Sequence, residues 1–407
     1  MIKTHLGNTS TLSSPEVRLL LLASRPTWVD GQRSLASALA LQVGRWDRFV
    51  DTAERKYALP MAYENLVDLD NGAFPDNALS ALRAASFRTT MNILRQQAAF
   101  DQFHESCVLA SRVEYAYFKG AAFAASFYAN PMQRYFRDVD ILIPARSRTD
   151  LIRCMLDQGC TVVPKTDADK RVFAKSTDAD LKQYLSLCSM PGMLTPQGLL
   201  VEIHDTPDNK TYLFSTDAML ARAEMVRIRQ QDVRVLPLVP HIVFSLYHHS
   251  THLWSKLNWV ADIDAICTHP SFDRDEVLYY SRKLGIEASI LAAFELRDLT
   301  GSARLPEDFA VSTAGVDFLH ACVEGLAGDV PLEKTMRRYQ RMDALSFDWQ
   351  PNPIPMWKFV WRRLVNYKPQ YSDFMLLPGG VWFRYAAGIV IGLVRSAHRR
   401  IAQAMER

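Results

Sequence analysis

One stretch of the sequence decides the fold: RYFRDVDILI, residues 134–143. In its second half, Asp138 and Asp140 alternate with three aliphatic residues. Residues two apart in a β-strand point to the same face of the sheet. The two carboxylates therefore project together while the aliphatic side chains face a core. We predict a strand over Phe136–Ile143, closed by Pro144.

Two carboxylates side by side repel each other unless a cation lies between them. Their oxygens suit Mg²⁺ (or Mn²⁺), which orients a triphosphate and stabilises developing charge in phosphoryl transfer. The chain has six Asp-x-Asp pairs, but only Asp138/Asp140 lies in an apolar β-pattern after a Lys-Gly turn. We expect this pair to bind metal; a structural role is the alternative.

A third carboxylate is expected on a neighbouring strand, within Gly198–His204. Glu202 and His204 share one face of that strand, and the aliphatic residues between them share the other. Glu202 is the best candidate for a third metal ligand or a general base. The alternative is a half-exposed edge strand with ordinary polar residues outward.

The remaining pattern places helices around this small sheet. Helical periodicity covers about residues 15–110 and resumes after about 236. The predicted class is α+β: a small mixed β-sheet core over 111–235, flanked by an N-terminal helical region (1–110) and a C-terminal helical domain with a basic aromatic tail (236–407). The expected strands are Val113–Phe118, Phe136–Ile143, Thr161–Val163, Gln183–Cys188 and Gly198–His204, and the expected later helices are Ala121–Tyr128, Thr149–Leu156, Ile242–Leu257, Trp259–Cys267, Glu276–Leu284 and Ala288–Leu296.

Several of these residues together resemble the uncharacterised bacterial nucleotidyltransferase family, within the polymerase-β-like nucleotidyltransferase superfold. The resemblance rests on Lys119-Gly120-Ala-Ala, Tyr128, Arg134 four residues before Asp138-Val-Asp140-Ile-Leu-Ile, and Val201-Glu202-Ile-His204. It continues weakly at His241, His248, Trp254, Leu257 and Asp262, and it covers roughly residues 40 to 270.

This resemblance implies that Asp138 and Asp140 bind metal, that Glu202 completes the triad, and that the substrate is a nucleoside triphosphate. Lys119 and Gly120 would occupy the turn that is Gly-Ser in the wider superfold and cradles phosphates.

Here that serine is absent, because Ala121 follows Gly120. Lys119 or Arg134 can offset the loss by contacting phosphate directly. For Arg134, a salt bridge to Asp138 or a surface charge is the alternative. We expect Lys119, Gly120, Arg134 and His204 to line the nucleotide site.

These features predict a Mg²⁺-dependent nucleotidyltransferase that moves a nucleoside monophosphate from an NTP to an acceptor and releases pyrophosphate. The alternative is a catalytically degenerate binding or regulatory protein on the same fold. Gly-x-Gly-x-x-Gly, Walker and Gly-x-Ser-x-Gly motifs are absent, which disfavours Rossmann, P-loop and α/β-hydrolase sites.

His248 and His252 lie four apart on a predicted helix, a spacing that can bind zinc. No obvious third ligand follows, so packing or polar contact with the core is the alternative, and Asp262 can position such a histidine. The six cysteines form no Cys-x-x-Cys pair, which argues for reduced thiols in a cytosolic protein.

Charge is distributed unevenly along the chain. Residues 351–407 hold nine basic and two acidic residues, or +7, so the other 350 residues carry −4 of the total of +3. Basic residues mixed with aromatics suit an anionic membrane surface or stacking on nucleic acid; a terminal helix packed on the core is the alternative. No strong nucleic-acid signal is found. We expect a cytoplasmic protein with peripheral membrane contact through 375–407.

Overall fold

The structure is a computed structural model of the 407-residue chain. It describes residues 14–302, apart from 30, 70–73, 165–169, 171–176, 178, 180–191 and 209–212. It also describes 322, 326, 375, 377–380, 382–392 and 394.

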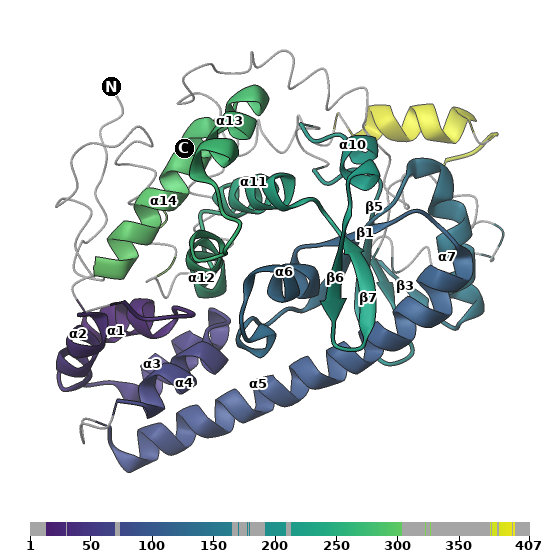
Figure 1. Ribbon diagram of the computed structural model, residues 1–407. Helices are drawn as coiled ribbons and strands as arrows, with labels where there is room; N and C mark the ends of the chain where they lie inside the picture. Colours follow the sequence, from purple (N-terminus) through teal and green to yellow (C-terminus); the bar gives the residue numbers. More distant parts are fainter. Residues whose placement is uncertain are drawn as a thin grey trace.

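A seven-stranded mixed sheet lies at the centre of the described chain, in the order β3-β4-β5-β2-β1-β7-β6 (Figure 1). Strand β2 pairs antiparallel with β1 and parallel with β5, and β1 pairs parallel with β7. The outer pairs β3–β4, β4–β5 and β6–β7 are antiparallel. The strands are β1 (Ala116–Phe118), β2 (Asp138–Leu142), β3 (Thr161–Val163), β4 (Gly192–Leu194), β5 (Leu200–His204), β6 (Glu224–Ile228) and β7 (Gln231–Val235).

Helices precede, interrupt and follow the sheet. The helices are α1 (Pro15–Ala23), α2 (Gln32–Ala40), α3 (Trp46–Arg55), α4 (Leu59–Val67), α5 (Asp76–Phe103), α6 (Gly120–Phe127), α7 (Arg148–Asp157), α10 (Thr216–Ala221), α11 (Leu238–Ser250), α12 (Leu257–Cys267), α13 (Arg274–Leu284) and α14 (Glu287–Ser302). Short segments are the π-helical η2 (His104–Leu109) and the 3₁₀ turns η3 (Pro131–Gln133) and η4 (Ala145–Ser147).

The two faces of the sheet belong to two hydrophobic cores. Val139, Ile141 and Ile143 pack on one face with the end of α5, with η2 and with α7. Phe118 and Leu142 point to the other face and join a core formed largely by the helices. Because residues two apart share a face, Asp138 and Asp140 lie on this second, helix-covered face with Leu142.

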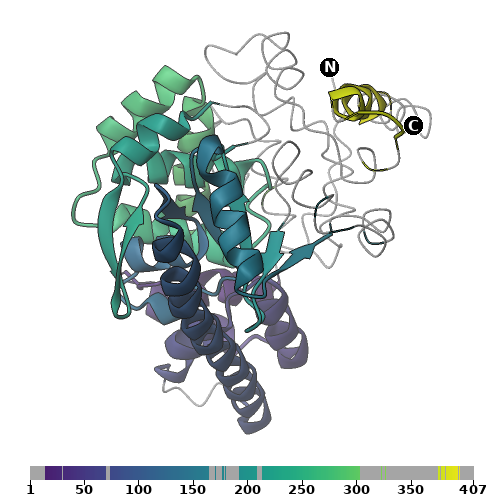
Figure 2. The same cartoon turned by 90° about the vertical axis from the view of Figure 1, so that its right-hand side faces the viewer.

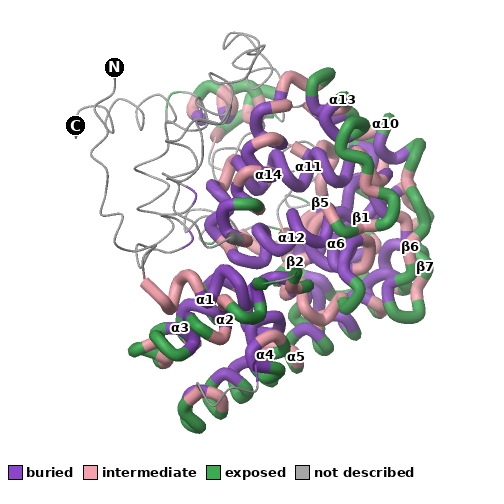
Figure 3. The backbone as a smooth tube through the Cα atoms, turned by 60° about the vertical axis from the view of Figure 1, so that its left-hand side comes forward, coloured by how far each residue is buried: buried purple, intermediate pink, exposed green. Residues whose placement is uncertain are grey.

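The helices before and after the sheet share that second core. Figure 3 shows α11 and α12 buried along most of their lengths, and α1 packs against α14. A buried ion pair of 2.6 Å joins Arg25 after α1 to Asp264 in α12. Helix α5 runs from the N-terminal helices along the sheet (Figures 1 and 2). Boundaries near residues 110 and 235 remain a proposal.

The predicted fold class is confirmed, and so are the strands that carry Asp138, Asp140 and Glu202. Three strands were not predicted: β4, β6 and β7. The β6–β7 hairpin turns through Arg229 at φ 53°, where a sequence signal of glycine or asparagine is missing. The strand expected at Gln183–Cys188 lies outside the described residues.

The helix expected over Ile242–Leu257 was wrong at its end. Helix α11 stops at Ser250, and the chain turns through Leu253 and Trp254, both at positive φ, before α12 begins at Leu257. Trp254 is fully buried, so packing holds a turn that the local sequence does not announce. As a result Lys256 caps α12 instead of lying within a helix.

Only part of the C-terminal tail is described. Residues 382–392 are helical, with Trp382 and Phe383 largely exposed. Within the described residues, helices are too short or too polar to cross a bilayer. Membrane contact through 375–407 stays a prediction, since most of its basic residues lie outside the described part.

Candidate functional site

The turn after β1 brings Lys119 and Gly120 against the backbone of β2. Gly120 has φ +26°, and a Cβ at this position would lie 2.8 Å from the carbonyl oxygen of Asp138. Lys119 itself adopts φ 55° and ψ −155°, a region that side-chain-bearing residues rarely occupy. Only glycine allows this close approach at 120, and the strained lysine beside it points to a functional constraint.

Parallel pairing of β2 with β5 brings the carboxylates together. The register sets Asp140 opposite Glu202, Asp138 opposite Leu200 and Leu142 opposite His204. One ligand atom each from Asp140, Glu202 and His204 lies within 4.8 Å of the other two, the one such group among the described residues. Asp138 lies on the same face two residues before Asp140, beside this group.

Positive charge from the β1 turn partly balances the carboxylates. Lys119 Nζ donates to Asp140 Oδ1 at 2.7 Å, and the carboxylate is 3% exposed. Burial opposes both charged forms. Nevertheless Asp140 raises the pKa of Lys119, while Lys119 and His204 hold the pKa of Asp140 at about 2. Asp140 is therefore ionised throughout the neutral range.

His204 ties Asp140 to Glu202. Its Nε2 lies 2.9 Å from Asp140 Oδ1 and 3.5 Å from Glu202 Oε2. Burial and Lys119 disfavour a charged imidazole, but the hydrogen bonds to the two carboxylates outweigh them and raise the pKa of His204. The hydrogen bond with His204 in turn lowers the pKa of Glu202.

Asp138 differs from its neighbour because it has no ion-pair partner among the described residues. Burial, reinforced by the negative charges of Asp140 and Glu202, raises the pKa of Asp138 to about 6. Lys119 and Lys256 act in the opposite direction but do not prevail. The site thus contains a carboxylate, Asp138, that none of the described cations pairs with.

The group fits a hard divalent cation. The converging ligand atoms belong to Asp140, Glu202 and His204, whereas the predicted Asp138 lies beside this group and not within it. Carboxylate oxygens such as those of Asp140, Glu202 and Asp138 are the ligands that Mg²⁺ and Mn²⁺ prefer. Imidazole is a softer donor, so His204 suits the role of orienting the carboxylates that it contacts. The observation that carries this fit is that three carboxylates from two adjacent strands face one space, and that Asp138 has no ion-pair partner within the described part of the chain.

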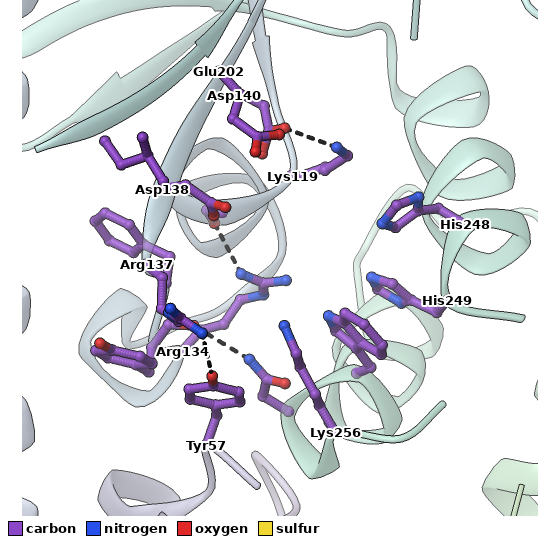
Figure 4. A pocket seen from close by; sticks show the side chains of 16 residues that line it. Tyr57, Lys119, Arg134, Arg137, Asp138, Asp140, Glu202, His248, His249 and Lys256 are labelled. Atoms are coloured by element: carbon purple, nitrogen blue, oxygen red, sulfur yellow. Dashed lines mark hydrogen bonds and ion pairs between the residues drawn. The ribbon is translucent and has the colours of Figure 1, made fainter. Parts of the chain in front are cut away.

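Asp138, Asp140 and Glu202 face a cleft of about 600 Å³ between the sheet and the helices. Figure 4 shows Asp138, Asp140 and Glu202 on one side, with His248, His249 and Lys256 across the space. The lining residues are Tyr57, Lys119, Gly120, Arg134, Tyr135, Phe136, Arg137, Asp138, Asp140, Leu200, Glu202, His248, His249, Lys256, Asn258 and Trp259. The volume is that of a small-molecule site.

A second, smaller cavity of about 190 Å³ adjoins the cleft. Lys119, Glu202 and His248 line both spaces. His204, His252 and Asp208 line only the smaller one. Two openings thus meet at Glu202.

Arg134 lines the cleft, but its charge is already paired. Its Nε and Nη2 donate to the two oxygens of Asp262 at 2.7 and 2.8 Å, and its Nη1 donates to the carbonyl of Gly120 at 3.1 Å. Arg134 is 3% exposed. Its partner is therefore Asp262, not Asp138, and it is not a surface charge. Arg134 anchors the Gly120 turn to helix α12.

His248 and His252, whose spacing can bind zinc, pack beside Trp259. Their rings are 4.9 Å apart, and their ring centres lie 6.3 and 5.7 Å from that of Trp259. His249 stacks on Trp259 at 4.8 Å, and its Nε2 lies 3.9 Å from Asp262. Burial, aided by Arg134, lowers the pKa of His249 well below its ordinary value, so this imidazole is neutral.

Sequence reasoning missed Tyr57 and Lys256 as cleft residues. Tyr57 follows α3 at φ 62° and stacks on Tyr135 at 5.3 Å. Its Oη accepts a hydrogen bond of 3.0 Å from Arg137. Lys256 lies over the rings of Tyr57 and Trp259. Tertiary packing alone brings residues 57 and 256 together, and no local motif signals it.

Comparison with known proteins adds one finding. A family model described as "Uncharacterised nucleotidyltransferase" matches residues 43–300, more than half of the chain. The match spans Tyr57, both carboxylate strands, Lys256 and Asp262. None of the curated proteins matches the sequence.

Proposed function

The chain belongs to the uncharacterised nucleotidyltransferase family, and on that premise we propose that it is a Mg²⁺- or Mn²⁺-dependent enzyme. It transfers a nucleoside monophosphate from an NTP to an acceptor. The acceptor oxygen forms a bond to the α-phosphorus, the bond between the α- and β-phosphates breaks, and pyrophosphate leaves with the electron pair.

One observation carries the proposal: three carboxylates from two adjacent strands face one cleft. Asp138 and Asp140 alternate on β2, and register pairing sets Glu202 of β5 directly beside Asp140. A bound divalent ion would offset their repulsion and supply Lewis-acid stabilisation of the developing phosphate charge. Asp138, Asp140 and Glu202 would hold it.

Four further contributions come from side chains and backbone around the carboxylates. Lys119 keeps its ammonium 2.7 Å from Asp140, and Gly120 lets the β1 turn lie against β2. His204 orients Asp140 and Glu202 through hydrogen bonds. Among the described residues that line both cavities, Glu202 is the one that carries a carboxylate, so it is placed to accept the proton of an acceptor hydroxyl.

The two cavities support a division of the substrates. The cleft of about 600 Å³ takes the nucleotide, and the cavity of about 190 Å³ takes the reacting end of the acceptor. A water molecule occupies about 30 Å³ of liquid, so the smaller cavity suits a group of a few heavy atoms, such as one hydroxyl-bearing side chain or part of a sugar ring.

Calorimetric titration of Mg²⁺ and each NTP into the wild type and Asp138→Asn tests the proposal. We expect Mg²⁺-dependent binding of at least one NTP by the wild type. The affinity should fall more than about tenfold in Asp138→Asn, since outer-shell partners alone are worth 10–100-fold in metal affinity. Asp275→Asn is the matched control, because Asp273/Asp275 is also an Asp-x-Asp pair but is exposed.

Equal binding by the wild type and Asp138→Asn would contradict the metal role. Catalysis is examined separately by incubating the wild type with α-labelled NTPs and searching co-purified protein, RNA and small molecules for added nucleotide. Metal and NTP binding without any adduct or pyrophosphate release would favour the non-catalytic alternative.

A further inference from the structure

Lys256 is a partly buried cation in the cleft with no carboxylate at ion-pair distance among the described residues. Its Nζ lies 4.9 Å from the ring centre of Tyr57 and 4.4 Å from that of Trp259. The other cleft-lining cations differ. Lys119 is paired with Asp140 and Arg134 with Asp262, while Arg137 is exposed.

The surroundings of Lys256 are fixed from two distant parts of the chain. Lys56 Nζ donates to the carbonyl of Ser255 at 3.1 Å, and the amide of Leu257 donates to the carbonyl of Lys56 at 3.0 Å. The next residue, Tyr57, is held at φ 62°. A non-glycine residue in that region costs on the order of 1 kcal/mol and persists only where its surroundings enforce it.

The aromatic rings hold the ammonium but do not neutralise it. Cation–π contact supplies about 0.5–2 kcal/mol, less than burial of an unpaired charge costs. Consistent with this, burial lowers the pKa of Lys256, and Asp138 across the cleft only partly opposes the shift. An anion bound beside Lys256 would complete its electrostatic environment.

The position of Lys256 in the cleft indicates which anion it would bind. Figure 4 shows its side chain directed into the cleft, across the space from Asp138 and Asp140. In the proposed reaction a divalent cation lies between the carboxylates and the reacting α-phosphate, so this phosphate lies on the carboxylate side of the cleft. A triphosphate that reaches across the cleft therefore brings its terminal phosphates towards Lys256.

We propose that Lys256 binds the terminal phosphates of the NTP, the future pyrophosphate. The ammonium is a point charge with three rotatable donors, which suits phosphate oxygens. Arg137, whose Nη1 donates to Tyr57 Oη, holds the tyrosine ring against which the ammonium rests. This inference rests on the proposed nucleotidyltransferase function.

The test compares affinities for an NTP and for the matching NMP, with Mg²⁺ present, in the full-length wild type, Lys256→Met and Lys256→Arg. We expect Lys256→Met to bind the NTP at least about tenfold more weakly, the usual value of a hydrogen bond to a charged group. The NMP affinity should change less than about twofold, and Lys256→Arg should retain most of the NTP affinity.

Lys283→Met is the matched control. Its Nζ lies 4.3 Å from the ring centre of Tyr279 on α13, and it lines neither cavity. This variant loses a cation–π contact on the exposed surface, so its NTP affinity should stay at the wild-type value. Lys256→Gln, with circular dichroism and thermal melting, guards against a folding defect in the methionine variant.

The outcomes separate the two proposals. Unchanged NTP affinity in Lys256→Met, or equal losses for NTP and NMP, would overturn the role of Lys256 and leave the proposed function standing; equal losses would indicate a structural wall residue. Failure of the wild type to bind any NTP would overturn the proposed function and this inference together.

Discussion

Two Asp-x-Asp pairs of the same composition have opposite environments. Asp262 and Asp264 lie on the buried helix α12, and arginines neutralise both. Asp262 accepts two hydrogen bonds from Arg134 and one of 2.7 Å from Tyr128. Asp264 pairs with Arg25 and with Arg297 at 2.6 and 2.7 Å.

The pair on strand β2 is compensated far less. Asp140 contacts Lys119 and His204, but Asp138 has no ion-pair partner among the described residues, and Glu202 adds a third carboxylate. Buried charges are normally paired. The difference teaches that charge compensation, rather than the motif, separates a structural pair from a candidate metal site.

The largest expected effect comes from replacing one aspartate of each pair by asparagine. Asp262→Asn should lower the free energy of unfolding by about 3–5 kcal/mol, because Arg134 would remain buried without its counter-ion. Asp138→Asn in metal-free buffer at pH 7 should be at least as stable as the wild type. A pKa raised to about 6 means that the folded state disfavours the ionised carboxylate.

Urea-induced unfolding measures both changes. Asp47→Asn is the control, since its pair with Arg45 is exposed and such pairs contribute about 0–1 kcal/mol. The contrast between the two pairs would disappear if Asp262→Asn were as stable as the wild type, or if Asp138→Asn were strongly destabilised.

Sequence periodicity predicted the parts of the site that depend on local order. Alternation within residues 138–143 and 199–204 identified both carboxylate strands and the face that carries Asp138, Asp140 and Glu202. Neither pattern specifies the pairing partner of a strand. The parallel register that puts Asp140 beside Glu202, and Leu200 opposite Asp138, comes from tertiary packing.

Features built from distant residues were out of reach. Arg134 finds Asp262 across 128 positions, so its partner could not be chosen from neighbouring carboxylates. The turn after α11 contains no glycine or proline, and buried Trp254 holds it at positive φ. That turn, together with the hydrogen bonds between Lys56 and residues 255 and 257, brings Lys256 against Tyr57.

A smaller effect is expected at Gly120, which contacts both the Arg134–Asp262 ion pair and the strand that carries Asp138 and Asp140. Its carbonyl accepts from Arg134, and its Cα lies against the backbone of Asp138. In Gly120→Ala the new Cβ would meet the Asp138 carbonyl at 2.8 Å. We expect a loss of about 1–3 kcal/mol, typical of overpacking, and a weaker affinity for Mg²⁺ with NTP, because β2 must shift.

Gly198→Ala is the matched control for backbone strain. Gly198 has φ +82° but open space around its Cα, so alanine there costs only the positive-φ penalty of about 1 kcal/mol. Its ligand affinity should match the wild type. Equal effects of the two variants in chemical denaturation and in nucleotide titration would show that Gly120 does not couple the Arg134–Asp262 ion pair to the carboxylates of β2.

The smallest expected effect is on the pH dependence of stability, and it comes from His241, which is buried near the Arg134–Asp262 ion pair. His241 of α11 packs between Phe123 and Phe127, and burial, aided by the charge of Arg134, lowers its pKa to about 3. Between about pH 6.5, the pKa of an unfolded histidine, and pH 3, the unfolded state binds a proton that the folded state excludes. Stability must therefore fall as the pH falls through this window, on the order of 1 kcal/mol per pH unit for this group.

His241→Phe should remove that share of the slope between pH 6 and 5 in urea unfolding. It should cost no stability at pH 7, since the ring's Nε2 has no hydrogen-bond partner in the described part of the chain. An unaltered slope would mean that His241 can take up a proton in the folded protein. The surroundings of Arg134 would then be more accessible to water than a buried ion pair requires.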